Sequence, residues 1–166
     1  MAQNINQTKD TAGVIAPPPL LALAVVVLGL LLDWLLPAYL LMLMLSMGER
    51  IVIGAILIAA GLALAISARG AFVSAGTNVE PWKPSTALVT AGIFGRLRNP
   101  MYVGGTLVLA GLSILLASDW MLVLTIIFVP LIHYGVVRRE ERYLAAKFGE
   151  PYVQYCKAVS RYGWPG

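Results

Sequence analysis

Two clusters of polar residues stand out in an otherwise apolar chain. Residues 96–102 hold two arginines, an asparagine, a proline and a tyrosine, and residues 138–141 are two arginines followed by two glutamates. Such side chains can hydrogen-bond a polar ligand and hold its charged groups, and tyrosine and glutamate can also take part in proton transfer. We therefore expect a cofactor site where the two clusters meet.

The composition around these clusters is that of a membrane protein. Hydrophobic residues make up 59% of the chain and charged residues 12%, against about 45–50% apolar residues in soluble domains. The basic residues flank the apolar runs, a pattern typical of membrane topology, so the net charge of +4 does not indicate nucleic-acid binding. A single cysteine, Cys156, excludes an intrachain disulfide and a cysteine-built metal site, and we expect no metal.

The apolar runs predict an all-α integral membrane protein with about four transmembrane helices and cytoplasmic C-terminal helices. Spans are expected at residues 20–36, 51–68, 100–116 and 120–137. Segment 38–47 is ambiguous: it extends the first helix, lies at the surface, or forms a fifth span. Within one domain of 166 residues we expect an N-terminal tail (1–16), the first two spans (17–70), a cytoplasmic loop (71–99), a helical hairpin (100–137) and C-terminal helices (138–166).

Lysine and arginine set the expected orientation. They gather in the segment between spans two and three and in the C-terminal segment, whereas the other two connections hold only Arg50. Because positive residues favour the cytoplasmic side, four spans place both termini and the 71–99 loop in the cytoplasm.

A short turn at residues 118–119 brings the two clusters together. It forces the last two spans to run antiparallel, so residues equidistant from the turn lie at similar depth, which puts Tyr102 near His133 to Gly135. Helical spacing along the last span turns Glu140 toward the bundle and Glu141 elsewhere. Taken singly, these residues have plain structural explanations, and we assign Arg96 and Arg98 to topology and surface charge. The residues of both clusters together, in this order along the chain, favour a cofactor site.

Two blocks of the sequence resemble the signature of isoprenylcysteine carboxyl methyltransferases, whose wider group includes phospholipid N-methyltransferases. The blocks are LVTAGIFGRLRNPMYVG at 88–104 and EERYLAAKFGEPYVQY at 140–155, and the resemblance covers residues 79–164. It implies that S-adenosylmethionine binds between the last two spans, the preceding loop and the C-terminal helices, and that the lipid substrate enters from the bilayer. By the resemblance, cofactor contacts fall on Thr86, Ala87, Leu88, Val89, Phe94, Asn99, Pro100, Met101, Tyr102 and Glu140.

The sequence departs from that family at two positions. Asn99 stands where the family has a histidine before the proline, and Val136 stands where prenylcysteine enzymes place an arginine on the substrate carboxylate. Arg138 and Arg139 are candidate replacements for that arginine from a different face. The change argues against a prenylcysteine substrate and leaves open a carboxylate, amine or hydroxyl acceptor.

The expected activity is methyl transfer from S-adenosylmethionine to a lipophilic or lipid-linked acceptor. A methyl sulfonium is already activated, so alignment and exclusion of water are the main requirements. An amine or hydroxyl acceptor also needs a base, for which His133, Tyr102 and Glu140 are candidates. No glycine-rich dinucleotide fingerprint is present. Two other hypotheses are an NADPH-dependent membrane reductase of the sterol type and a non-catalytic membrane subunit of the same fold. The sequence does not indicate an oligomeric state.

Overall fold

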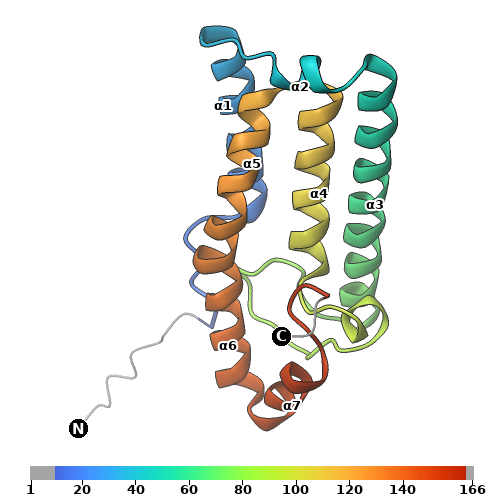
Figure 1. Ribbon diagram of the computed structural model, residues 1–166. Helices are drawn as coiled ribbons and strands as arrows, with labels where there is room; N and C mark the ends of the chain where they lie inside the picture. The colour runs from blue at the N-terminus through green and yellow to red at the C-terminus, as the bar shows by residue number, and fades with distance from the viewer. Residues whose placement is uncertain (1–9, 164–166) are drawn as a thin grey trace, which may run out of the picture.

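The computed structural model describes residues 10–163, and every regular element in this range is helical, which confirms the all-α prediction. In chain order the elements are α1 (Pro18–Leu35), α2 (Leu40–Met44), α3 (Met47–Ser74), the 3-10 turn η1 (Gly92–Gly95), α4 (Pro100–Leu115), α5 (Asp119–Ile132), the π-helical segment η2 (His133–Val137), α6 (Arg138–Phe148) and α7 (Glu150–Ala158). Helices α1, α3, α4 and α5 form a bundle, and α5 continues through η2 into α6 (Figure 1).

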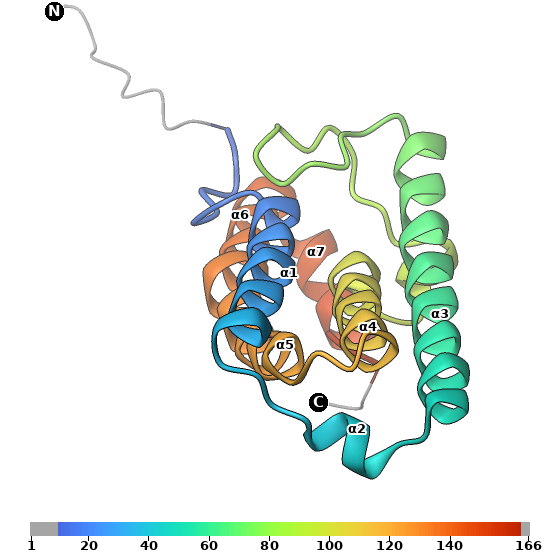
Figure 2. The same cartoon turned by 90° about the horizontal axis from the view of Figure 1, so that it is seen from above.

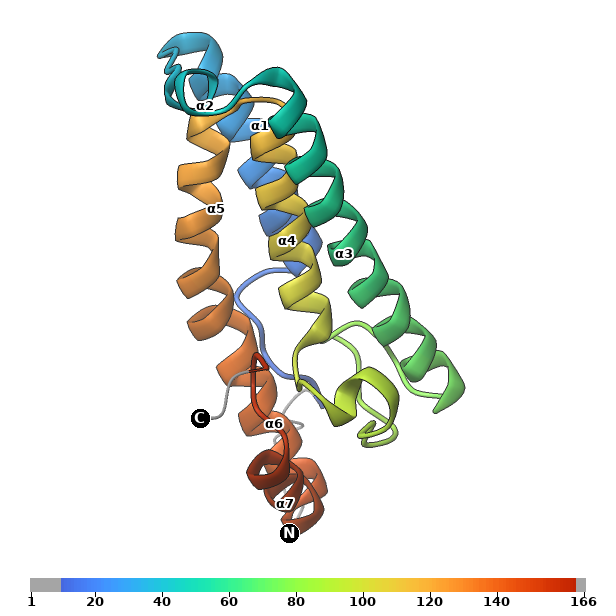
Figure 3. The same cartoon turned by 45° about the vertical axis from the view of Figure 1, so that its right-hand side comes forward.

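Three of the described helices are long and apolar enough to cross a membrane: α1, α3 and the continuous helix Asp119–Phe148. Helix α4 is also apolar but has 16 residues, which is about 24 Å of helix against a hydrocarbon layer of about 30 Å. It stands inside the bundle between α3 and α5 (Figures 1 and 3). The four helices lie where the four spans are predicted, and three of them are long enough to cross a membrane.

The ambiguous segment 38–47 contains only the five-residue helix α2, which links α1 to α3 across the end of the bundle (Figure 2). Five helical residues rise about 7.5 Å, so this segment does not form a fifth span. The Asp119 carboxylate holds it in place by accepting hydrogen bonds from the backbone N–H groups of Leu40 (2.7 Å) and Leu41 (3.0 Å). The connection is therefore anchored to the turn between α4 and α5.

Helices α3 and α4 pack through glycines. A methyl group placed on Gly61 would lie 2.5 Å from the carbonyl oxygen of Gly104, and one on Gly54 would lie 2.9 Å from that of Gly111. No larger side chain fits at such distances, so the two backbones touch directly. Gly54 and Gly61 therefore allow the close approach of α3 and α4.

The apolar core lies between α1, α4 and the α5–η2 helix. Its buried members are Val25, Leu109, Met121, Phe128, Ile132, Val136 and Val137. On the outside of the bundle, many large apolar side chains are exposed, among them Ile126 at 65% and Leu20 at 59%. An exposed apolar belt of this extent fits a protein whose surroundings are lipid.

The ends of the chain pack against the α6 end of the bundle. Helix α7 lies against α6, and the chain then turns back toward the bundle (Figure 3). Residues 10–16, which we call the N-terminal strap, run beside η2 and α6: the Ala12 N–H donates to the Pro81 carbonyl (3.4 Å), and that of Ile15 to the Gly135 carbonyl (3.2 Å). The rest of the predicted tail, residues 1–9, lies outside the described residues.

The connection between α3 and α4 is shorter than the predicted 71–99 loop. Helix α3 continues to Ser74, because the apolar residues 71–73 extend it past Gly70. The stretch 92–95 forms η1, whose Phe94 is buried and packs edge-on against Phe72 of α3 with 5.0 Å between ring centroids. The second half of the connection is thus fixed to the bundle.

Candidate functional site

The two polar clusters meet at one hydrogen bond. The phenol of Tyr102, in the first turn of α4, donates to Oε2 of Glu140, in the first turn of α6, over 2.8 Å. Pro100 occupies the first position of α4, where its missing N–H costs nothing, and this fixes the direction in which the following turn presents Tyr102. The hairpin therefore brings the clusters together.

A polar cavity opens beside this bond, between the 78–89 loop, η1, α6 and α7. Its space is about 600 Å³ when the open mouth is included. Its polar lining comes from Asn78, Glu80, Ser85, Arg98, Asn99, Glu140 and Glu141, and its apolar and aromatic lining from Phe72, Val79, Pro81, Ala87, Leu88, Val89, Phe94, Leu144, Tyr152 and Tyr155. The cavity thus combines carboxylates, amides and aromatic faces.

A narrower space of about 270 Å³ continues this cavity toward α4. It shares Asn99 and Glu140 with the polar cavity and adds Pro100, Met101 and Tyr102. All but one of the predicted cofactor residues line one or both of these spaces. The exception is Thr86, which is exposed: its hydroxyl donates to the Gly76 carbonyl and its N–H to the Thr77 hydroxyl.

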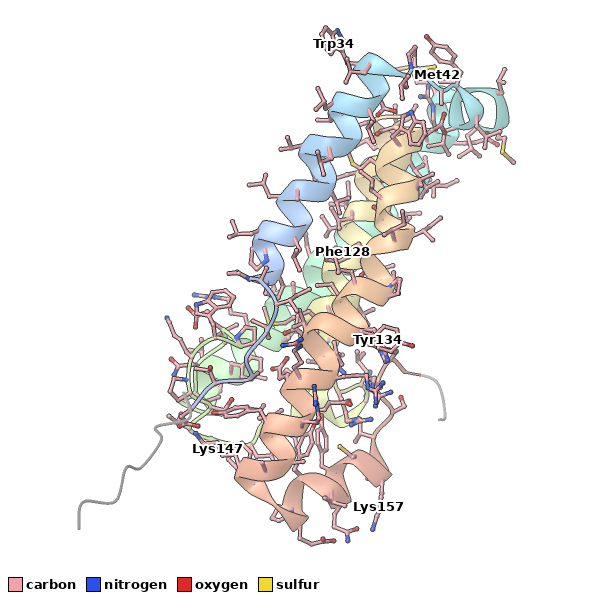
Figure 4. All side chains as sticks on the ribbon, turned by 90° about the vertical axis from the view of Figure 1, so that its left-hand side faces the viewer. Trp34, Met42, Phe128, Tyr134, Lys147 and Lys157 are labelled. Carbon is pink, nitrogen blue, oxygen red and sulfur yellow. The ribbon has the colours of Figure 1, made fainter. Side chains whose placement is uncertain are left out.

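An apolar pocket of about 760 Å³ lies on the other side of Tyr102, between α1, α4, α5 and the loop at 79–82. Its lining is Pro18, Pro19, Ala22, Val79, Glu80, Pro81, Trp82, Met101, Tyr102, Gly105 and Phe128, and Phe128 is seen midway along the bundle in Figure 4. Met101 and Tyr102 line both this pocket and the narrow space. Tyr102 therefore stands where the polar and apolar spaces adjoin.

The other two predicted catalytic residues lie away from these spaces. Nδ1 of His133 is 2.8 Å from the Tyr162 hydroxyl, and His133 lines none of the three cavities. The Arg139 guanidinium donates to the Gly13 carbonyl over 2.9 Å, on the outer face of α6 under the N-terminal strap. The structure brings Tyr102 and Glu140 together and leaves His133 and Arg139 outside.

An ion-pair network that the sequence reading missed closes the polar cavity on its far side. Glu141 binds Arg161 through two hydrogen bonds (2.7 and 2.8 Å) and Arg98 at 3.0 Å, and Arg98 also contacts the Cys156 sulfur at 2.7 Å. The Glu141 hydrogen bonds raise the pKa of the Arg161 guanidinium. Because the Asn99 amide donates to the Arg161 carbonyl (3.3 Å), the network holds the turn before α4 against the C-terminal segment.

Two tyrosines of α7, also missed, complete the wall. Tyr152 is buried, and the Tyr155 hydroxyl donates to the Phe94 carbonyl over 2.7 Å. Burial raises the pKa of both phenols, so both stay neutral hydrogen-bond donors at physiological pH. The signal in the sequence was their spacing of three residues, which places both on one face of a helix.

Comparison with known proteins fits this arrangement. A family described as phospholipid methyltransferase matches residues 49–151, more than half of the chain and including all of α4, α5 and α6. No curated protein and no solved structure matches the chain significantly. The long apolar helices and this family match together identify an integral membrane protein.

Proposed function

Because the chain belongs to the phospholipid methyltransferase family, we propose that it is an enzyme that transfers a methyl group from S-adenosylmethionine to a lipophilic or lipid-linked acceptor. The observation that carries this proposal is the position of Tyr102 between a polar cavity and an apolar pocket. A polar cofactor and an apolar acceptor need separate compartments that meet at the reacting atoms, since methyl transfer depends on alignment and on exclusion of water.

The polar cavity suits S-adenosylmethionine by its donors and acceptors. When bound, the cofactor supplies a methyl group already activated by a sulfonium. The carboxylates of Glu140 and Glu141 can accept hydrogen bonds from its ammonium or hydroxyl groups, and Arg98 offers a cation to its carboxylate. The aromatic residues Phe94 and Tyr155 offer apolar faces to its adenine.

The apolar pocket suits the acceptor and favours an amine or hydroxyl over a carboxylate. Within the described residues, no lysine or arginine lines it, and its one charged lining residue is Glu80. Val136, where the related enzymes place an arginine, is fully buried in the core, and Arg139 lies outside the pocket. A carboxylate there would lose its hydration without gaining a cation.

The Tyr102–Glu140 pair is placed to accept the proton that an amine or hydroxyl acceptor must lose. Tyr102 lines the acceptor pocket and is hydrogen-bonded to Glu140, which lines the cofactor cavity. A proton leaving the acceptor can pass to the Tyr102 oxygen while Tyr102 passes its own to Glu140. The two residues thereby act as one base.

We also propose that the α6–α7 end of the bundle faces the cytoplasm. The described chain begins and ends at this end, with the loop at 75–91 beside it (Figures 1 and 3). Among residues 10–163, Arg50 is the only lysine or arginine at the opposite end, so the positive-inside rule gives this orientation. S-adenosylmethionine would then enter from the cytoplasm and the acceptor from the membrane.

Transfer of label tests the proposal. Purified protein is incubated with a membrane lipid extract and methyl-labelled S-adenosylmethionine, and label is counted in the organic phase. We expect the wild type and Glu150→Gln, which removes an exposed carboxylate on the same end, to label lipid, and Glu140→Gln to label it weakly. Wild-type protein that binds the cofactor but leaves every lipid fraction unlabelled would contradict the proposal.

A further inference from the structure

A basic groove lies along the C-terminal segment. It is an open space of about 1300 Å³ between η1, the end of α7 and residues 159–162. Four of its lining residues are cationic: Arg96, Arg98, Lys157 and Arg161. Within the described residues, no carboxylate lines it.

The groove keeps a net positive charge after its ion pairs are counted. Arg98 and Arg161 share a single carboxylate, that of Glu141. Arg96 and Lys157 are exposed and take part in none of the ion pairs among residues 10–163. In addition, Nε of Arg98 is buried without a hydrogen-bond partner. Four guanidinium and ammonium groups with one counter-charge make a site for an anion.

The groove begins at the level where the apolar part of the bundle ends. Its Tyr162 bonds His133, in the last apolar turn of the α5–η2 helix. The next residue, Tyr134, is 62% exposed, and the Arg138 guanidinium lies 5.7 Å from the centre of its ring. An exposed tyrosine stacked with an arginine is typical of the headgroup layer of a membrane. Figure 4 shows Tyr134 beside the C-terminal segment, with Lys157 farther from the bundle.

An exposed apolar stripe leads from the bundle to this level. Ile127, Leu131 and Tyr134 recur at helical spacing along one face and are 55%, 41% and 62% exposed. An acyl chain can pack along this stripe while its headgroup reaches the cations below. This continuity distinguishes a lipid from a soluble anion.

We propose that the basic groove binds the phosphate of an anionic phospholipid from the surrounding leaflet. Arginine matches phosphate oxygens with paired N–H groups, and lysine adds a mobile charge. The groove is separate from both the cofactor cavity and the apolar pocket, so the proposal does not depend on the methyl-transfer activity. Only Arg98 borders both the groove and the cofactor cavity.

A lipid titration tests the proposal. Purified protein in a neutral detergent is titrated with dihexanoylphosphatidylglycerol, with the zwitterionic dihexanoylphosphatidylcholine, or with glycerol phosphate, and the midpoint of thermal unfolding is followed by tryptophan fluorescence. The test variant is Arg96→Gln/Lys157→Gln, which leaves the Glu141 network intact. The control, Arg69→Gln/Arg142→Gln, removes two exposed charges from the same end of the bundle but outside the groove.

We expect the anionic lipid to raise the wild-type midpoint at concentrations where the zwitterionic lipid does not. The test variant should need about thirty-fold more anionic lipid, since each lysine or arginine near an anionic headgroup contributes about a factor of five. The control should respond like the wild type. Equal responses of wild type and test variant, or equal losses in test and control variants, would overturn the groove as the site. A full response to glycerol phosphate alone would overturn the lipid as its ligand.

Discussion

Tyr102 and Glu140 are 38 residues apart in the chain, and the Tyr102 hydroxyl donates a 2.8 Å hydrogen bond to the Glu140 carboxylate. Tyr102 lies in the first turn of α4 and Glu140 in the first turn of α6, on either side of the place where the polar spaces adjoin the apolar pocket. Glu140 lines the polar cavity and Tyr102 lines the apolar pocket. On the proposed mechanism, substitutions of the two residues should therefore act differently on cofactor affinity and on the rate of methyl transfer.

Tyr102→Phe should lower the rate of methyl transfer more than it lowers cofactor affinity. The substitution keeps the ring that forms the wall and removes only the hydroxyl. Loss of a general base typically costs on the order of 10²–10⁴ in rate, and because Glu140 remains nearby we expect about a hundredfold loss. Steady-state kinetics together with cofactor titration would separate the two quantities. A tenfold or greater loss of cofactor affinity at an unchanged maximal rate would assign Tyr102 to cofactor binding instead.

Glu140→Gln should weaken cofactor binding by about ten- to a hundredfold. A hydrogen bond to a charged group contributes about 1.5–3 kcal/mol, and glutamine keeps the shape of the side chain but not its charge. Equilibrium binding of S-adenosylhomocysteine to the purified variant would measure the change. Glu150→Gln is the matched control, since Glu150 is exposed and lines neither cavity nor pocket.

Glu141→Gln should destabilise the fold by about 2 kcal/mol, because it leaves the nearly buried Arg98 without its carboxylate. Arg161→Gln should cost less, since Arg161 is more exposed and the Arg98–Glu141 pair survives. Thermal or denaturant unfolding in detergent would rank the two variants. The reverse order would show that the network is held mainly from the C-terminal side.

Gly61→Ala should lower stability by about 1–3 kcal/mol through overpacking against α4. The added methyl group would meet the Gly104 carbonyl oxygen at 2.5 Å, and neither backbone can move without disturbing the bundle. Gly70→Ala is the control, because a methyl group there meets nothing within 4 Å. Equal unfolding midpoints for the two variants would contradict the direct α3–α4 contact.

The N-terminal strap should be released in acid. Hydrogen bonds from Lys147 and then Tyr143 lower the pKa of Asp10 below its ordinary 3.8, and the Asp10 contact raises the pKa of Lys147 above its ordinary 10.5. The stabilisation from Asp10 is therefore present above pH 3.8 and lost as the pH falls through its lowered pKa. The stabilisation from Lys147 is present below pH 10.5 and lost as the pH rises through its raised pKa.

Hydrogen exchange of the Ala12 and Ile15 amides, which the strap protects by bonds to Pro81 and Gly135, measures this release. Protection should fall in acid for the wild type and should be lower already at neutral pH in Asp10→Asn. Protection that is unchanged in this variant would show that the backbone bonds alone hold the strap.

The meeting of the two clusters was predictable because it depends on local features. A short turn at residues 118–119 sets the hairpin, and Ser118 caps α5 by accepting a hydrogen bond from the Met121 N–H. The equidistance rule places Tyr102 near His133 to Gly135, whereas its hydroxyl reaches Glu140, one to two turns farther along. The length of the tyrosine and glutamate side chains, together with the π-helical segment between them, explains the difference.

The rest of the site depends on contacts that leave no periodic signal. Arg98 and Glu141 looked like surface charges, yet both are drawn inward when the C-terminal segment returns and brings Arg161 beside them. The strap is equally non-local, since Asp10 pairs with a lysine 137 residues away. Thr86 lies in the block of residues assigned by resemblance, but its hydroxyl bonds the Gly76 carbonyl and turns it from the cavity. The spacing of residues in a helix predicts which side chains share a face of that helix. It does not predict where an irregular segment, such as the C-terminal segment or the strap, runs in the fold.

The most direct measurement for the central claim is a calorimetric titration of the purified protein with S-adenosylhomocysteine and, separately, with NADPH. The wild type and Glu150→Gln should bind S-adenosylhomocysteine with equal affinity, Glu140→Gln should bind it at least tenfold more weakly, and none should bind NADPH. Binding of NADPH in preference would identify a reductase. Absence of binding for both ligands by a folded wild-type protein would indicate a non-catalytic subunit, and either result would contradict the proposed methyl transfer.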